Sequence, residues 1–197
     1  MRYWKVLVGL LLIFGFIGCG QEEGSAQKPT YKDGDKLELR SVVGSKLTLL
    51  RKNGGFVLEG DENKILILDI FGTFCKPCQK EATKLMDFQL KNDKDVLLIG
   101  FTYLEDVTDQ YVVENFSSKF NAYYFIVNSP DNEKMVNTIT KDIGYNQAVQ
   151  VPFKVVLKNG KYQKVTDPFG ESPDDNFYIG AIDTDIIEKD IQKIKAK

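Results

Sequence analysis

Two cysteines stand two residues apart near the middle of the chain, and their setting could support redox chemistry. Cys75 and Cys78 enclose Lys76 and Pro77, follow an apolar run at 65–71, and open a segment with helical periodicity. Two thiols at this spacing can close into a disulfide and reopen. The helix dipole and the unpaired N–H groups of the first turn stabilise a thiolate on the first cysteine. A strand, a Cys-x-x-Cys pair and a helix in this order favour redox chemistry over metal binding.

A zinc site and a pair of inert, reduced thiols are the alternatives for these cysteines. Structural zinc takes four ligands, and one Cys-x-x-Cys pair supplies only two of them. The chain has no histidine, and its third cysteine, Cys19, stands alone near the N-terminus. We therefore expect no metal and favour the redox interpretation.

The N-terminus has the composition of an export signal. Arg2 and Lys5 precede an apolar stretch at 6–17, which is short for a membrane span. The stretch ends at Gly18-Cys19, after which the chain becomes polar. This junction resembles the lipobox of bacterial lipoproteins, in which the cysteine is lipidated and becomes the first residue. An ordinary cleaved signal and an uncleaved anchor are the alternatives, and both of them also export the domain.

We therefore expect a signal peptide at 1–18, lipid attachment at Cys19 and a flexible tether at 19–34. The acyl chains would hold the protein on a membrane surface, facing the periplasm, without crossing the membrane. Loss of 1–18 leaves 24 basic and 28 acidic side chains, a net charge of −4. This charge disfavours nucleic acid as the main partner.

The cysteine count also bears on the role of the central pair. If Cys19 carries lipid, the mature domain has only Cys75 and Cys78. A disulfide that closes so short a loop restricts the unfolded chain very little, so it adds little stability. The pair is therefore better suited to chemistry than to stabilisation.

The apolar segments predict one α/β domain at 35–197. Strands are expected at 36–40, 46–51, 56–58, 64–71, 95–102, 122–127, 152–157 and 161–165, and helices at 76–92, 107–120, 132–143 and 182–194. The residues at 167–175 are rich in proline and glycine and are expected to form an exposed loop. Alternating strands and helices predict a partly parallel sheet with helices on both faces, a three-layer α/β/α sandwich that begins with a β-hairpin.

The motif and its surroundings resemble the thioredoxin superfamily over residues 46–197. The resemblance rests on Asp69-Ile-Phe-Gly-Thr-Phe-Cys75-Lys-Pro-Cys78-Gln-Lys-Glu81 and on Val151-Pro152 further along the chain. Within the superfamily, the Gly72-Thr73-Phe74 lead-in and the inserted helix and strand at about 107–127 are similar to membrane-anchored thiol-disulfide oxidoreductases of the TlpA/ResA/CcmG type. The resemblance implies a thioredoxin-like fold with an inserted α-β element. It implies no cofactor beyond the redox-active disulfide of Cys75 and Cys78.

The resemblance also assigns roles to individual residues. Cys75 is the expected attacking thiolate, and Cys78 would resolve the mixed disulfide. Pro152 is expected to follow a cis peptide bond and to face the cysteine pair, where the backbone of Val151 would pair with a substrate chain. A simple proline at a strand start is the alternative. Phe74 replaces the usual tryptophan and is expected to contact substrate.

Two acidic residues are further candidates. Asp69 is the only charged residue of the apolar run, and burial raises the pKa of a carboxyl group. Its position matches the buried acid of thioredoxins, which exchanges a proton with the resolving cysteine, although TlpA-type proteins often have asparagine there. The alternative is that Asp69 faces a solvated edge. Glu105 lies near a second active-site glutamate of the subfamily, and an ordinary acidic residue at a helix start is its simpler interpretation.

Three functions remain open at this point. The first is a reductase of disulfides in periplasmic proteins, with apocytochrome c as a candidate substrate and a CcdA/DsbD-type membrane protein as electron donor. The second is a DsbA/DsbC-like oxidase or isomerase, although residues 103–121 have room for one helix and not for the helical domain of the oxidase. The third is a non-catalytic lipoprotein that uses a thioredoxin-like surface for binding.

Overall fold

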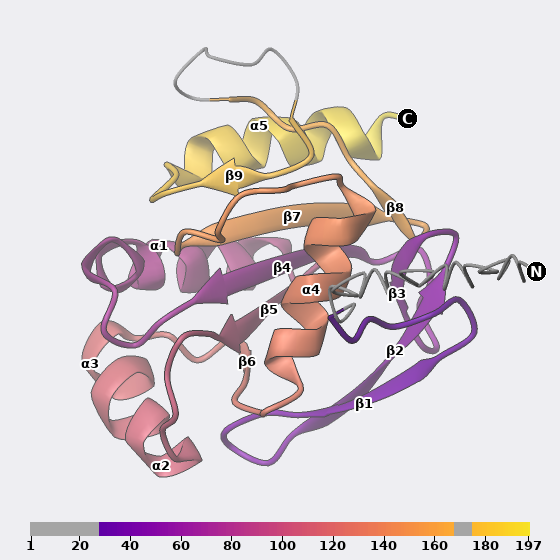
Figure 1. The fold of residues 1–197 in the computed structure, drawn as a ribbon. Helices are drawn as coiled ribbons and strands as arrows, with labels where there is room; N and C mark the ends of the chain where they lie inside the picture. Colours follow the sequence, from indigo (N-terminus) through magenta and orange to yellow (C-terminus); the bar gives the residue numbers. More distant parts are fainter. Residues whose placement is uncertain (1–27, 168–174) are drawn as a thin grey trace, which may run out of the picture.

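A computed structural model describes residues 28–167 and 175–197, which form two sheets and helices on both faces of the larger sheet (Figure 1). The expected three-layer α/β/α architecture is therefore confirmed. The expected signal peptide, Cys19, the first part of the tether and most of the loop at 167–175 lie outside the described residues.

The central sheet has the order β6-β5-β4-β7-β8, with β9 also paired to β7. Its strands are β4 (Ile65–Phe71), β5 (Val96–Thr102), β6 (Phe125–Val127), β7 (Phe153–Lys158), β8 (Lys161–Tyr162) and β9 (Tyr178–Ile179). The first three run parallel, and β7 runs antiparallel to β4. All seven residues of β4 are buried, as expected for an apolar strand at the centre of a sheet that is covered on both faces.

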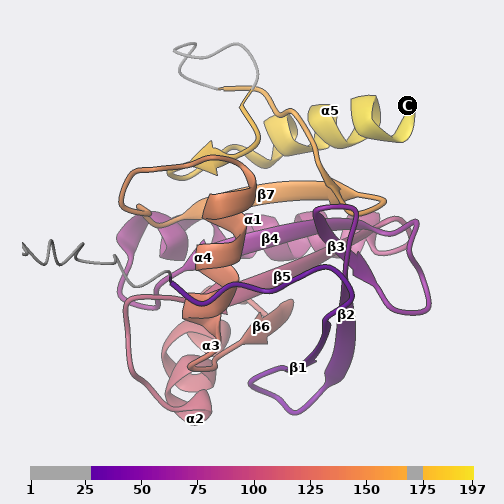
Figure 2. The same ribbon diagram turned by 45° about the vertical axis from the view of Figure 1, so that its right-hand side comes forward.

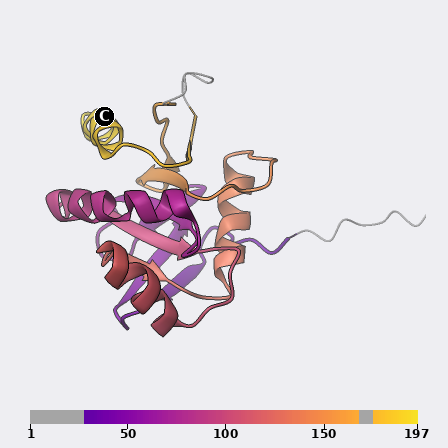
Figure 3. The ribbon, with the colours of Figure 1, turned by 90° about the vertical axis from the view of Figure 1, so that its left-hand side faces the viewer.

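Helices cover the two faces of this sheet unequally. One face carries α1 (Lys76–Asn92), α5 (Thr184–Lys195) and a helical segment made of α2 (Asp109–Val112), the π-helical η1 (Val113–Ser117) and α3 (Ser118–Phe120), and the other face carries α4 (Asn132–Asp142) (Figure 3). Alternate residues of β4 therefore enter different cores. Ile67 and Phe71 pack with α1 and α5, whereas Leu66 and Leu68 pack with α4. None of the helices in the described ranges is long and apolar enough to cross a membrane.

The N-terminal strands form a sheet of their own, which is larger than the expected hairpin. β1 (Lys36–Arg40), β2 (Lys46–Lys52) and β3 (Gly55–Leu58) pair antiparallel in sequence order and lie on the same side of the central sheet as α4 (Figure 2). Their buried side chains, including Leu49 and Phe56, join the core beneath α4. The small sheet thus completes the layer that α4 alone leaves partly open.

Two expected strands need correction, and the structure adds one strand that was not expected. The strand expected at 122–127 begins only at Phe125, because its pairing with β5 starts at Ile99 and the Ala122 N–H caps the preceding helical segment by bonding to Ser117 O. β8 ends at Tyr162 rather than at 165. β9 was not expected, since two residues carry no detectable period, and its pairing partner β7 is distant in sequence.

Gly55 allows β3 to approach the turn between β7 and β8. A Cβ at this position would lie 2.3 Å from Gly160 O and 2.7 Å from Leu157 Cδ2. We predict that Gly55→Ala lowers the free energy of unfolding by about 1–3 kcal/mol, since the backbone must shift to admit the methyl group. Urea denaturation measures the change. Gly54→Asn is the control, because Gly54 has open space and a φ of +81° that asparagine tolerates. Equal stabilities for the two variants would contradict the close approach.

Candidate active site

The two cysteines lie where α1 begins. Cys75 is the N-cap residue of α1, and its Sγ accepts a hydrogen bond from Cys78 N at 3.2 Å. The two residues form a disulfide with their Cα atoms 5.3 Å apart. Both side chains are nearly buried, with exposed fractions of 6% for Cys75 and 2% for Cys78. The unpaired N–H groups of the first helical turn therefore stabilise negative charge on the sulfur that is the more accessible.

A cis peptide bond faces this pair, as expected. The bond joins Val151 to Pro152, and Val151 O lies 3.5 Å from Cys75 Sγ. Gly180 N donates a hydrogen bond to Pro152 O at 2.9 Å, which attaches this turn to the loop that follows β9. The turn therefore places a main-chain carbonyl beside the sulfur that would meet a substrate.

Glu105 holds the loop that leads into the cysteines. Its carboxylate accepts hydrogen bonds from Thr73 N, at 2.7 Å, and from the Thr73 hydroxyl. The Gln79 side chain donates to Thr73 O at 2.6 Å from the other side of the loop. Glu105 lies four residues before α2 begins, so it does not act as an acid in the first turn of that helix. The structure thus gives Glu105 a positioning contact with the active-site loop, and Phe74 remains 54% exposed on that loop.

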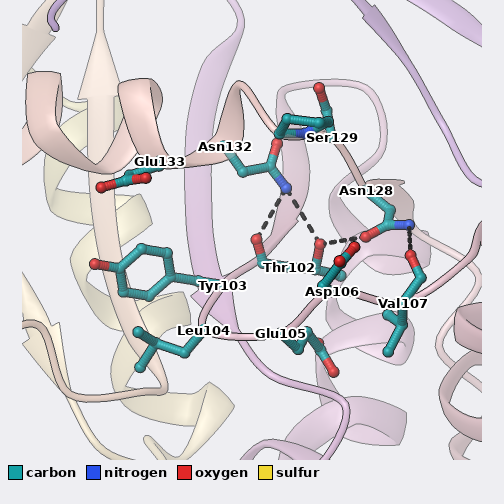
Figure 4. Close-up of a pocket in the computed structure, with 11 residues that line it drawn as sticks. Thr102, Tyr103, Leu104, Glu105, Asp106, Val107, Asn128, Ser129, Asn132 and Glu133 are labelled. Atoms are coloured by element: carbon teal, nitrogen blue, oxygen red, sulfur yellow. Dashed lines mark hydrogen bonds between the residues drawn. The ribbon is translucent and has the colours of Figure 1, made fainter.

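The loop that carries Glu105 borders a cavity of about 560 Å³ at the ends of β5 and β6 (Figure 4). Asn132 donates hydrogen bonds to the carbonyl and hydroxyl oxygens of Thr102, and Asn128 joins Thr102 to Val107 O. Figure 4 shows the Glu105 side chain extending away from these two asparagines. The hydrogen bonds hold both ends of the loop, so the loop can present Glu105 to Thr73.

Asp69 is buried and belongs to a cluster of three charged side chains. Lys154, its direct neighbour on β7, places Nζ 3.2 Å from Asp69 Oδ1 and also donates a hydrogen bond to Glu81 on α1. Glu81 accepts a further hydrogen bond from Ile182 N at 3.1 Å. The exposed fractions are 1% for Asp69, 0% for Lys154 and 4% for Glu81. The solvated-edge alternative for Asp69 is therefore wrong.

Burial dominates the electrostatics of this cluster. Loss of hydration raises the pKa of Asp69, and the Lys154 ammonium only partly offsets this effect. Burial also raises the pKa of Glu81 to about 7, with Lys154 lowering it and Asp69 raising it. Burial opposes the charge of Lys154, but the two carboxyl groups outweigh this effect and its pKa is raised.

The sequence interpretation did not predict the contacts of Lys154 and Glu81. Lys154 is the only charged residue within the apolar strand at 153–157, so the reasoning applied to Asp69 could have flagged it as well. Leu104 is a second omission, because it is 63% exposed and has a φ of 62°, a conformation unusual for leucine. No sequence signal indicates that conformation.

Across 28–167 and 175–197, no three Cys, Asp or Glu side chains gather as metal ligands would.

Comparisons with known proteins show a relationship in structure rather than in sequence. The sequence matches no family model and no curated protein. The structure resembles StoA from Bacillus subtilis, with 16% identity, 79% of this chain and 96% of that chain covered, and a TM-score of 0.53. It also resembles a thiol:disulfide interchange protein of the thioredoxin family from Chlorobium tepidum, with 13% identity, coverage of 84% and 96%, and a TM-score of 0.54.

A secreted disulfide oxidoreductase from Mycobacterium tuberculosis, described as homologous to E. coli DsbE, has 17% identity, coverage of 80% and 95%, and a TM-score of 0.51. The chain has the thioredoxin fold. In this thioredoxin-like domain, the cysteine pair and the cis peptide bond meet beyond the C-terminal end of β4, the strand that carries the buried Asp69.

The raised pKa of Glu81 predicts how stability depends on pH. An unfolded glutamate has a pKa near 4.5, and in the folded protein the value is about 7. Between these values the folded state binds more protons than the unfolded state, so stability falls as pH rises. We predict that in Glu81→Gln the free energy of unfolding falls by about 1–3 kcal/mol less over this pH range than in the wild type, because glutamine does not ionise. Free energies from urea denaturation across this pH range test the prediction, and parallel profiles for the two proteins would contradict it.

Proposed function

We propose that this protein is an exported, membrane-tethered thiol-disulfide oxidoreductase that reduces disulfides in periplasmic proteins. One observation carries the proposal. The Sγ of Cys75 lies at the N-terminus of α1 and 3.5 Å from the carbonyl of a cis X-Pro peptide. This arrangement stabilises a thiolate and places it beside main-chain groups that can bind an extended substrate chain.

The proposed reaction follows from the order of the two sulfurs. The Cys75 thiolate attacks one sulfur of the substrate disulfide, and the other sulfur leaves as a thiolate that takes up a proton. The thiol of Cys78 then loses its proton to the buried Asp69 carboxylate and attacks Cys75 Sγ, which releases the second substrate sulfur. The substrate gains two electrons, and the enzyme ends with the disulfide. Phe74 and the backbone of Val151 would hold the substrate during both steps.

Several features support reduction and a membrane location. The apolar N-terminal stretch and Cys19 are typical of an exported lipoprotein. The connection between β5 and β6 is described in full and holds a single helical segment at 109–120, which disfavours a DsbA-like protein with a large helical insertion. Structural neighbours that are described as a thiol:disulfide interchange protein and a secreted disulfide oxidoreductase agree with the proposed chemistry.

In the periplasm the enzyme's disulfide must be reduced again after each turnover. We propose a CcdA/DsbD-type membrane protein as the electron donor and apocytochrome c, whose disulfide would be reduced to thiols, as one class of substrate. The lipid tether would keep the domain close to a donor in the membrane. Cys78→Ala, expressed in cells, would trap substrates and donor as mixed disulfides that can be identified.

Insulin reduction with dithiothreitol tests the redox activity. Cys75→Ser should reduce the rate to that of dithiothreitol alone, because serine cannot form the mixed disulfide. Cys19→Ser is the matched control, since it removes the proposed lipid site but neither active-site sulfur, and it should retain the wild-type rate. Equal rates for wild type and Cys75→Ser would contradict enzymatic function. The reduction potential then separates the directions, with about −270 mV expected for a reductase and about −120 mV for an oxidase.

A further inference from the structure

Four positions on neighbouring strands line up across the central sheet at the level of Asp69. Asp69 pairs with Gly100 on one side and with Lys154 on the other, and Lys154 pairs with Tyr178. A Cβ at Gly100 would lie 2.9 Å from the ring of Tyr124, so the absence of a side chain there lets this ring cover the sheet beside Asp69. Asp69 thus lies between a buried ammonium group and a buried phenol.

The two acids of the cluster are bonded unequally. Glu81 accepts hydrogen bonds from both Lys154 Nζ and Ile182 N. Asp69 Oδ1 is buried and accepts no hydrogen bond, although Lys154 Nζ lies 3.2 Å away. Hydrogen bonds to a carboxylate favour its ionised form. The contacts therefore favour negative charge on Glu81 over negative charge on Asp69.

Among the residues that the structure describes, the charges around the cluster leave one acid without a counter-ion. Lys154 supplies one positive charge for two buried carboxyl groups, and the titratable side chain whose charge interacts with both is the phenol of Tyr124. Cys78 is buried on α1 three residues before Glu81, and its sulfur is held in the disulfide. Asp190 on α5 accepts a hydrogen bond from the hydroxyl of Tyr178 but does not contact the two acids. Its charge is balanced by an ion pair with Lys193 and a hydrogen bond from Thr166 N. A second buried anion would lose its hydration without gaining a counter-ion, and a proton on one acid removes that cost.

We propose that Lys154 is a positioning residue that assigns the single buried negative charge to Glu81 and leaves Asp69 protonated while the disulfide is closed. The consequence rests on the proposed function. When an incoming thiolate attacks Cys75 Sγ, the S–S bond breaks and its electron pair leaves on Cys78 Sγ. The proton of Asp69 then moves to that sulfur. In the opposite direction Cys78 returns the proton to Asp69, so the same acid serves both half-reactions.

Carboxyl ¹³C NMR of the oxidised full chain, labelled separately at aspartate and glutamate, tests this assignment. Asp69→Asn and Glu81→Gln identify the two signals. As pH rises, Glu81 should ionise first and Asp69 at higher pH. In Glu81→Gln, the ammonium of Lys154 has only Asp69 as a partner, so the titration midpoint of Asp69 should fall by about 1–3 pH units.

Lys154→Met should raise both midpoints, because neither acid then has a cation nearby. Glu188→Gln is the control and should leave both midpoints unchanged, since Glu188 contacts Asn92, Gln192 and Lys91 rather than the cluster. If Lys154→Met does not fold, Glu81→Gln still decides, because it retains the lysine.

Ionisation of Asp69 before Glu81, or an unchanged Asp69 midpoint in Glu81→Gln, would overturn the proposal. The insulin assay separates this outcome from failure of the proposed function. A protein with the expected titration order but no reductase activity keeps the charge assignment and loses the redox role. An active reductase with the reverse order keeps the redox role and loses the assignment.

Discussion

The antiparallel pairing of β4 with β7 is the contact on which the active site depends. The C-terminal end of β4 leads into the cysteine loop, and the N-terminal end of β7 follows the cis proline, so the pairing of Ile70 with Phe153 brings the two segments together. The same register places Asp69 opposite Lys154. One set of backbone hydrogen bonds therefore sets both the distance from Cys75 to Val151 and the partner of the buried acid. A shift of β7 by one residue would turn Lys154 to the face of the sheet opposite Asp69.

The rest of the fold keeps this junction rigid. The face of the sheet that carries α1 and α5 is a continuous apolar core around the cysteines, and the opposite face is closed by α4 together with β1, β2 and β3. Main-chain bonds also link the active-site loops, since Tyr103 N donates to Phe71 O and Gly180 N donates to Pro152 O. Catalytic geometry that rests on packed strands and a helix start tolerates less displacement than geometry that rests on a free loop.

The buried ionic cluster does not serve stability alone. Three ionisable side chains in an apolar core lose their hydration. Proteins in which apolar residues of similar volume replace such a cluster are often equally stable or more stable. The cluster also joins β4, β7, α1 and the segment just before α5 through a single lysine and its two acids. Groups whose protonation responds to nearby charge are suited to a site that must release and take up protons as a disulfide opens and closes.

The sequence alone determined the local features of the site. An apolar strand, Cys-x-x-Cys and an amphipathic helix are encoded within neighbouring residues. A lone aspartate in an apolar strand also indicates a buried carboxyl group that needs a polar or charged partner. The signal peptide and the lipid site at Cys19 were also read from local composition, and they stay predictions. The match of Val151-Pro152 to the superfamily pattern predicted the cis bond, because this dipeptide follows the Cys-x-x-Cys motif and precedes an apolar strand.

Only the tertiary structure decided which distant residues meet. The partner of Asp69 depends on the register between two strands far apart in sequence, and the contact of Glu105 with Thr73 depends on where the β5 loop turns. Likewise, β9 exists because β7 offers a free edge at its N-terminal end. Local periodicity carries the direction of a side chain relative to its own strand or helix. Local periodicity does not indicate which strand lies beside a given strand. The neighbouring strand supplies the partner of the buried charge, as β7 does for Asp69.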